Sequence, residues 1–316
     1  MKRFISKIFV FSIFPFGSLF GLFLLENGTA DPFYQRVVGG EKKSMVIGTS
    51  KAAQGIVPTV INEKLELDGE KKLYNFSFTT IHSPFGESYN AAIHKKIDKD
   101  SKDGVFIVTV DPWSLSSSKK DPNDRSMMPD NKLFLGKLSS FSPVVNLEYL
   151  LRFYINPYYE IPLRYFVENS MHLKEDGWLK ATPSIAEERY DRFYKSKIKE
   201  YEVRANRVKS SDYRIKSFTS LLDFLNEKGD VYVVVLPVDK NIYAIEKSIC
   251  PDAMSNIKQL CNSKGIPFKD FNKSDTNYDF VDGVHLNYKS ASLFSEDLAI
   301  WMMEVNSTNN QALSKD

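Results

Sequence analysis

Soft metal ligands are scarce in this chain of 316 residues, which has two cysteines and four histidines. Cys250 and Cys261 form no Cys-x-x-Cys pair, so the spacing of a structural zinc site is missing. The segment between them has a helical pattern, and eleven helical residues separate two Cα atoms by about 16 Å. A disulfide needs them within about 7 Å. The sequence therefore predicts two free, buried thiols and no metal or other cofactor.

An excess of one charge is also missing. Lys and Arg number 42 and Asp and Glu number 40, for a formal net charge of +2. A nucleic-acid partner calls for a basic face or stripe, and this balance provides no argument for one. Hydrophobic residues make up 42% and charged residues 26% of the chain, an ordinary mixture that can bury a sizeable core.

The one long apolar run is Ile8–Leu25, which no charged residue interrupts. Its length of about 18 residues just suffices to cross a bilayer as a helix. Lys2, Arg3 and Lys7 precede the run, which favours an N-terminus in the cytoplasm and export of the rest. Residues 1–30 are thus predicted to be a membrane anchor, or alternatively a signal peptide cleaved near Ala30. Both readings place residues 31–316 outside the cytoplasm.

Short β-branched or aromatic runs follow at wide spacing, which is typical of strands buried in a sheet. Helical patterns lie between them, and this alternation predicts an α/β domain over residues 31–316. Its expected form is a three-layer α/β/α arrangement around a mostly parallel sheet of about five strands. The expected strands are Ser44–Ile47, Leu73–Phe78, Val105–Val110, Val231–Leu236 and Ile266–Phe271. The expected helices are Glu87–Ile97, Ser184–Val208, Asp212–Lys228, Ala244–Ser263 and Tyr288–Val305.

Three segments depart from the alternation. Residues 112–183 form an insertion after the third strand, with a polar loop and an aromatic stretch, Tyr149–Phe166. This insertion either covers one end of the sheet or only packs against the domain without a functional role. Residues 31–43 are polar and read as a stalk, and the tail 306–316 is expected to be disordered.

Two short motifs carry side chains suited to catalysis. Gly48-Thr49-Ser50 stands where the first strand ends and a helix begins, at the edge where open α/β sheets bind ligands. Asp282-Gly283-Val284-His285 stands before the last helix. An Asp three residues before a His can accept the Nδ1–H of the imidazole and leave Nε2 free as a base. Each motif alone has a simpler reading, a helix N-cap for Ser50 and a turn for Asp282.

Together, the two motifs resemble the SGNH (GDSL-like) hydrolase superfamily, over residues 44 to 305. The resemblance implies a flavodoxin-like fold with Ser50 as nucleophile, His285 as general base and then acid, and Asp282 orienting His285. The family often has Gly-Asp-Ser where this chain has Gly-Thr-Ser. Its oxyanion hole draws on a glycine after the second strand and an asparagine after the third.

Candidate residues for substrate or oxyanion binding follow from the same comparison. Asn75 and Gly86 stand after the start of the second strand, and the sequence does not choose between them. Asp111 follows the third strand where the family has asparagine. An ionised carboxylate there would repel an oxyanion, so Asp111 is expected to bind a substrate hydroxyl or to serve the fold. His82, His94 and His172 have no evident partner and are expected to be structural or surface residues.

An N-terminal anchor with an SGNH-like domain outside the membrane is similar to the D-alanyl transfer protein of the teichoic-acid pathway and to the alginate acetylation proteins. That resemblance implies a serine acyltransferase or esterase acting on acyl groups of a cell-envelope polysaccharide, beside a membrane-bound O-acyltransferase. Two alternatives remain open at this point. One is a free-standing envelope esterase or lipase, and the other is a catalytically weak protein that keeps the fold to bind polymer or partner.

Overall fold

A single parallel sheet forms the centre of the computed structural model, which describes residues 1–141, 144–167, 171–181 and 187–313. The strand order is β2–β1–β3–β8–β9, and every neighbouring pair is parallel. Ranked by position in the chain, this is the flavodoxin-like order 2-1-3-4-5. The strands are β1 (Ser44–Ile47), β2 (Leu73–Asn75), β3 (Gly104–Thr109), β8 (Gly229–Val235) and β9 (Phe268–Asp270).

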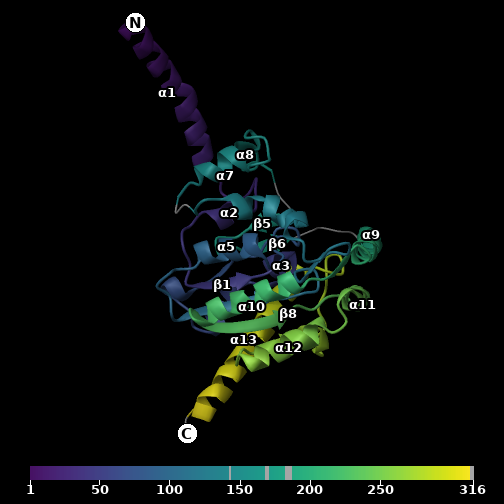
Figure 1. Cartoon of the computed structure of the whole chain (residues 1–316). Helices are drawn as coiled ribbons and strands as arrows, with labels where there is room; N and C mark the ends of the chain where they lie inside the picture. Colours follow the sequence, from purple (N-terminus) through teal and green to yellow (C-terminus); the bar gives the residue numbers. More distant parts are fainter. Residues whose placement is uncertain (142–143, 168–170, 182–186, 314–316) are drawn as a thin grey trace.

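Helices cover both faces of this sheet (Figure 1). Successive side chains of a strand point to opposite faces. Met45 and Phe106 belong to one apolar cluster, and their neighbours Val46 and Ile107 belong to the other. The first cluster is completed by α5 (Glu87–Lys96), α10 (Asp212–Asn226) and α12 (Ala253–Ser263). The second is completed by α3 (Ser50–Gly55), α4 (Pro58–Lys64) and α13 (Tyr288–Leu313). The predicted three-layer α/β/α fold is confirmed.

The helix α10 shows how the sequence specifies one layer. Ser211 caps its N-terminus, where the side chain accepts a hydrogen bond from the backbone N–H of Arg214. Phe218, Leu221, Leu222 and Leu225 are buried, at the i, i+3, i+4, i+7 spacing of one helix face. The face therefore packs on the sheet.

Several element boundaries differ from the sequence prediction, and the second strand, for example, ends at Asn75 where Phe78 was expected. The helix expected over Ala244–Ser263 is two helices, α11 (Lys240–Ile249) and α12, because Pro251 lacks an N–H and disfavours the helical conformation at Cys250. The last strand ends at Asp270, whose carboxylate accepts the N–H of Asn272 and starts a 3₁₀ turn, η4 (Phe271–Lys273). Cys250 and Cys261 are both buried free thiols.

The chain ends also differ from expectation. Residues 31–43 are no stalk, because α2 (Tyr34–Val37) is packed into the domain with Tyr34, Arg36 and Val37 buried. The two terminal nitrogens of the Arg36 guanidinium donate to the carbonyls of Pro32 and Gly177, while its buried Nε has no hydrogen-bond partner among the described residues. At the other end, α13 continues past Val305 to Leu313, through most of the expected disordered tail.

The segment between β3 and β8 holds the insertion and the helix that follows it. Its antiparallel pairs are β4 (Ser116–Ser118) with β7 (Val208–Ser210) and β5 (Met171–Leu173) with β6 (Leu179–Ala181). Its longest helix is α9 (Glu187–Ala205). The shorter elements are η2 (Arg125–Met127), η3 (Pro129–Lys132), α6 (Phe134–Lys137), α7 (Leu147–Arg152) and α8 (Glu160–Leu163). The short 3₁₀ turn η1 (Gly69–Lys71) precedes β2.

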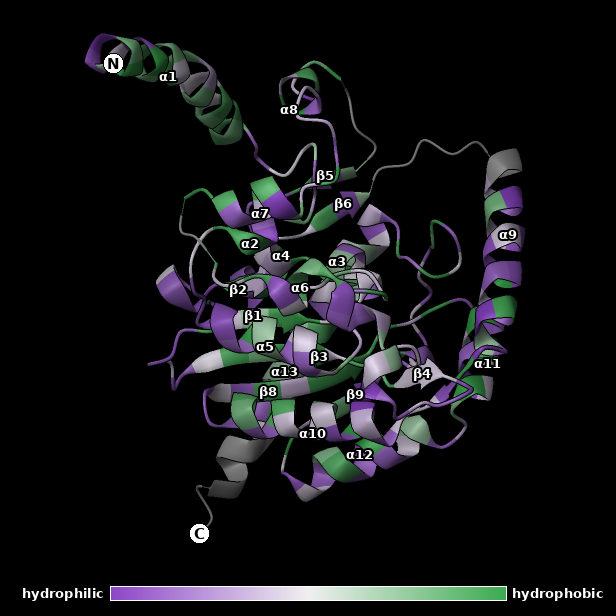
Figure 2. Ribbon diagram, turned by 45° about the horizontal axis from the view of Figure 1, so that its top comes forward, coloured by the Kyte–Doolittle hydropathy of each residue, from purple (hydrophilic) through white to green (hydrophobic). Residues whose placement is uncertain are grey.

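The first helix, α1 (Lys2–Leu24), projects away from the domain (Figure 1). Its ribbon is largely apolar in Figure 2, and it is the one helix in the described ranges long and apolar enough to cross a membrane. Pro15 lies inside it. The end of α13 lies at the opposite end of the molecule (Figure 1).

Lys96, at the end of α5, is buried and predicts a pH-dependent stability. Its ammonium donates to the carbonyl of Val38 at 2.6 Å and lies over the rings of Tyr74 and Phe141. Burial, with repulsion from Lys42, lowers the pKa of Lys96 to about 7. Because the folded-state pKa is below the unfolded value, the group opposes folding most below pH 7, and stability rises as the pH increases from about 7 to 10.

We therefore expect Lys96→Met to gain stability relative to the wild type at pH 7, and this advantage to be smaller at pH 9. The expected change in the difference is up to about 2–3 kcal/mol, since each pKa unit corresponds to about 1.4 kcal/mol. Urea unfolding at the two pH values measures it. Lys95→Met, at the exposed neighbouring position, is the control and should show the same stability difference at both. A pH-independent difference for Lys96→Met would contradict the prediction.

Candidate active site

Ser50 stands at the carboxyl edge of the sheet, at the first residue of α3. The strand β1 ends at Ile47, and Gly48 and Thr49 make the turn into the helix. A Cβ at position 48 would overlap the side chain of Thr109 on the neighbouring strand, so only glycine fits there. Thr49 holds an extended conformation at the N-cap, and its carbonyl accepts the N–H of Ala53. Ser50 is thereby held at the start of the helix.

The second motif forms a closed turn before α13. Asp282 accepts hydrogen bonds from the backbone N–H groups of Val284 and His285, at 3.0 and 2.9 Å. Gly283 adopts φ +83°, in the left-handed region that favours glycine. The N–H of Val281 donates to the carbonyl of His285 at 2.7 Å and closes the turn. These local bonds fix the carboxylate of Asp282 against the imidazole of His285.

A continuous hydrogen-bond chain joins the two motifs. The Oγ of Ser50 lies 2.9 Å from Nε2 of His285. The Nδ1 of His285 lies 3.0 and 3.1 Å from the two carboxylate oxygens of Asp282. Burial alone would raise the pKa of Asp282, but the hydrogen bonds and charge of His285 outweigh it and hold that pKa well below its usual range. Asp282 is therefore an ionised acceptor that keeps Nδ1 protonated and Nε2 turned toward Ser50.

Asp111 belongs to a buried polar cluster next to Ser50. Its Oδ2 accepts the hydroxyl of Thr49 at 3.0 Å and lies 3.5 Å from the ammonium of Lys51. Its Oδ1 accepts the N–H of Ser114 at 2.8 Å. Both neighbours of Ser50 in the chain are thus tied to one carboxylate on the loop after β3. Of the two roles expected for Asp111, the contacts are those of fold support, since its carboxylate is buried and engaged.

Glu246 of α11 completes the cluster. It accepts hydrogen bonds from Lys51 at 2.5 Å and from the indole N–H of Trp113 at 2.8 Å. Burial and the nearby charge of Asp111 raise the pKa of Glu246, while Lys51 opposes the shift. Burial would lower the pKa of Lys51, but the two carboxylates overcome this and raise it. Lys51 is accordingly a permanent cation shared by two acids.

Asn75 and Gly86 were the two other residues predicted for the oxyanion hole. The side-chain amide of Asn75 donates hydrogen bonds to the carbonyls of Ala52 and Ile56, at 2.9 and 3.1 Å. Both of its N–H groups are therefore engaged, and none is left for a substrate oxygen. Gly86 is the N-cap of α5, and a Cβ there would meet the guanidinium of Arg214. The expectation for Asn75 is corrected, because its amide ties α3 to β2, whereas an oxyanion role for Gly86 stays a prediction.

The other histidines lie apart from this chain of hydrogen bonds. His82 packs between the rings of Phe33 and Phe134, and burial lowers its pKa to about 4. His94 stacks on Phe224 at 3.8 Å. His172 is exposed on β5. These places agree with the structural or surface roles expected for them.

The helix α9 supplies contacts that the motifs did not reveal. The Nζ of Lys197 lies 3.9 Å from Oδ2 of Asp282. The ring of Tyr194 covers Gly283, and its hydroxyl donates to Asp239 at 2.5 Å. Tyr201 packs edge-on against Trp113. A signal was present in the sequence, because residues 194, 197 and 201 recur at the three- and four-residue spacing of one helix face.

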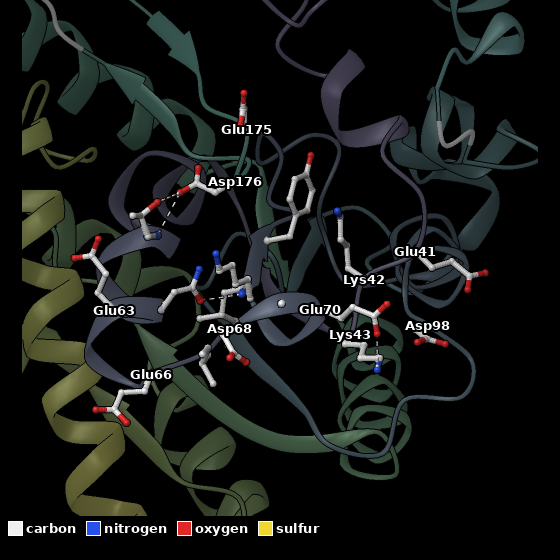
Figure 3. Close-up of a pocket in the computed structure, with 17 residues that line it drawn as sticks. Glu41, Lys42, Lys43, Glu63, Glu66, Asp68, Glu70, Asp98, Glu175 and Asp176 are labelled. Carbon is white, nitrogen blue, oxygen red and sulfur yellow. Dashed lines mark hydrogen bonds and ion pairs between the residues drawn. The ribbon is translucent and has the colours of Figure 1, made fainter.

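Two cavities bear on the site. One of about 350 Å³ opens beside the turn that holds Asp282 and His285 and is lined by Tyr190, Asp279, Phe280, Val281, Asn287, Tyr288 and Lys289. A larger one of about 1080 Å³ lies along the edge strand β2 (Figure 3), and none of Ser50, Asp282 and His285 lines either cavity. Eight of its seventeen lining residues are carboxylates, among which Glu70 pairs with Lys43 and Asp176 accepts a hydrogen bond from Thr59.

No protein-family model matches the chain. No curated protein matches it either. Among solved structures, an aryl esterase from M. smegmatis is 10% identical, with a TM-score of 0.37 over 84% of this chain and 99% of that one. A carbohydrate acetylesterase from Sinorhizobium meliloti is 10% identical, with a TM-score of 0.38 over 84% of this chain and 100% of that one. A gut microbial diltiazem-metabolizing enzyme is 10% identical, with a TM-score of 0.39 over 86% of this chain and 49% of that one. The α/β fold assigned to this chain follows from its own strand order.

Proposed function

We propose that this chain is a serine-dependent acyltransferase or esterase that acts on O-acyl groups of a cell-envelope polysaccharide. The observation that carries the proposal is the hydrogen-bond chain from Ser50 through His285 to Asp282, with 2.9 Å between Oγ and Nε2. A serine hydroxyl is a weak nucleophile unless an adjacent base takes its proton. The proposal assigns the role of base to His285 and the role of orienting group to Asp282.

The proposed reaction has two halves. The Nε2 of His285 takes the hydroxyl proton as Oγ of Ser50 attacks the acyl carbon, and the departing alcohol leaves with that proton. An ester on Ser50 remains. A sugar hydroxyl or water then attacks this ester, gives its proton to His285, and Oγ recovers it on leaving. The N–H of Ser50 is one proposed oxyanion donor, because the first N–H groups of a helix have no intrahelical acceptor.

A polysaccharide substrate is supported by the cavity beside the turn. Its lining combines the rings of Tyr190 and Tyr288 with the polar side chains of Asp279 and Asn287. Aromatic faces with nearby hydrogen-bonding groups suit sugar rings, which are apolar on one face and polar at their edges. In the proposal, α1 anchors the domain, its basic N-terminus stays in the cytoplasm, and a membrane-bound O-acyltransferase is the partner.

The test uses the full chain in detergent, treated with p-nitrophenyl acetate and with a fluorophosphonate probe. We expect acetyl release and labelling in the wild type, and loss of both in Ser50→Ala and in His285→Ala. Ser248→Ala, on the exposed end of α11, is the control and should react as the wild type does. Faster turnover on addition of an oligosaccharide acceptor favours transfer, and an unchanged rate favours a free-standing esterase. A folded wild type as inert as Ser50→Ala would overturn the proposal.

That inert outcome would support a second candidate, a binding protein that retains the fold. The observation in its favour is the amide of Asn75, whose two N–H groups are both engaged. The two functions separate in one further measurement. A binding protein should retain its affinity for an acylated oligosaccharide in Ser50→Ala, without any labelling of the wild type.

A further inference from the structure

An exposed apolar surface lies beside the foot of α1, on the segment that contains α7 and α8. Figures 1 and 2 both show these helices at the end of the domain from which α1 projects. Ile155 and Phe166 are 87% and 86% exposed there. We call the surface the apolar shelf, and its members are Leu151, Ile155, Tyr159, Tyr165, Phe166 and Val167. Soluble proteins rarely leave so many large apolar side chains together in water.

Specific contacts hold the shelf against the end of α1. The hydroxyl of Tyr165 donates to the carbonyl of Leu25 at 2.6 Å. The hydroxyl of Tyr154 donates to the carboxylate of Glu26 at 2.7 Å. The rings of Phe23 and Tyr158 meet edge-on at 5.2 Å. The residues that follow α1 are therefore part of the domain surface, with no free linker between helix and shelf.

The length of α1 sets the depth of these contacts in a bilayer. Its 23 residues span about 34 Å at 1.5 Å per residue, close to the hydrocarbon thickness of about 30 Å. If Lys2 and Arg3 stay at one surface, Leu24 reaches the other. Tyr165 and Tyr154, bonded to the next two residues, then lie at the level of the lipid headgroups.

We infer that the apolar shelf is a second membrane contact, inserted into the headgroup layer of the bilayer that α1 crosses. The inference rests on the membrane anchoring proposed above. Tyrosines such as Tyr159 and Tyr165 are favoured at this depth because the ring is apolar and the hydroxyl polar.

Electrostatics point to an apolar contact without preference for anionic lipid. The segment from residue 144 to 167 carries two acids and two bases, which pair within the helices. Arg152 contacts Glu148 at 2.6 Å, and Arg164 contacts Glu160 at 2.8 Å. A net charge of zero provides no attraction to negative headgroups. With α1, the shelf holds the domain at two points, which limits its rotation about the foot of α1 and sets the height of Ser50 above the membrane.

Fluorescence quenching in vesicles tests the inference on the full chain. Single cysteines at Ile155 and Phe166 are labelled with the polarity-sensitive dye NBD and reconstituted in phosphatidylcholine vesicles that contain spin-labelled lipid. Cys250 and Cys261 are buried and should not react. Phe14→Cys, on α1, reports the anchor. Ile300→Cys, on α13 and 46% exposed, is the matched control in a helix that leads away from α1.

The expected result is a loss of NBD emission to spin-labelled lipid at positions 155 and 166, and none at position 300. Added anionic lipid should leave the loss unchanged. Quenching at position 14 without quenching at 155 and 166 would overturn the inference that the apolar shelf contacts the membrane, while α1 would still be an anchor. It would favour a protein partner for this surface. Absence of quenching at all four positions would overturn both.

Discussion

Replacing Asp282 by asparagine is expected to slow the acylation of Ser50 by about 10⁴-fold, the scale of this change in a serine triad. The physical reason lies in the imidazole of His285, whose Nδ1 is 3.0 Å from the carboxylate. An amide N–H at that place would donate to Nδ1 and put the ring proton on Nε2. Nε2 would then donate to Ser50 and be unable to take its proton. The charge that stabilises the imidazolium would also be gone.

Asparagine is the informative substitution because it leaves the turn intact. The Oδ1 of residue 282 would still accept the N–H groups of Val284 and His285. Single-turnover acetyl transfer from p-nitrophenyl acetate measures the rate, with circular dichroism as a check on folding. Asp275→Asn, at an exposed position on the preceding loop, is the control and should react at the wild-type rate. An Asp282→Asn rate within tenfold of wild type would show that Asp282 does not orient the base.

The parts of this site that the sequence predicted depend on local rules. Ser50 was placed by the end of a buried strand and the start of a helix. Asp282 and His285 were placed by a spacing that one turn can close. The hydrogen bonds that close the turn from Asp282 to His285, and the one from Ala53 to Thr49 that starts α3, are made within a few residues, so short patterns suffice to predict them.

The parts that the sequence missed depend on contacts between distant segments. Lys51 and Glu246 are 195 positions apart, and nothing local in either segment indicates the pair. Asn75 looked free to bind substrate, but the carbonyls of α3 that occupy its amide come from another element. The break at Pro251 had a local signal, since proline disfavours the helical conformation at the preceding residue. The burial of α2 had no local signal. A polar segment can be buried only if distant groups bind its polar side chains, as the carbonyl of Gly177 accepts a hydrogen bond from Arg36.

The buried cluster behind Ser50 leads to the largest expected effect on stability. Lys51 is 4% exposed and lies between two acids, 2.5 Å from Glu246 and 3.5 Å from Asp111. Lys51→Met would leave the two carboxylates buried without a cation. Removing one partner of a buried ion pair costs about 3–5 kcal/mol, and we expect a loss of that size in the free energy of unfolding. Urea unfolding at pH 7 measures it.

The pH dependence and a double variant identify the cause. Burial already raises the pKa of Glu246, and without Lys51 that pKa rises further, so Glu246 takes up a proton on folding and the loss in Lys51→Met should be smaller at pH 5 than at pH 8. Lys240→Met, an exposed lysine at the start of α11, should change stability by less than about 0.5 kcal/mol. Lys51→Met/Glu246→Leu removes both charges and should recover part of the loss. If the double variant is as stable as the wild type but its Ser50 is acylated more slowly, the cluster also positions Ser50, through its contacts with the two neighbouring residues. A single Lys51→Met variant as stable as the wild type would show that the shared cation does not hold the cluster together.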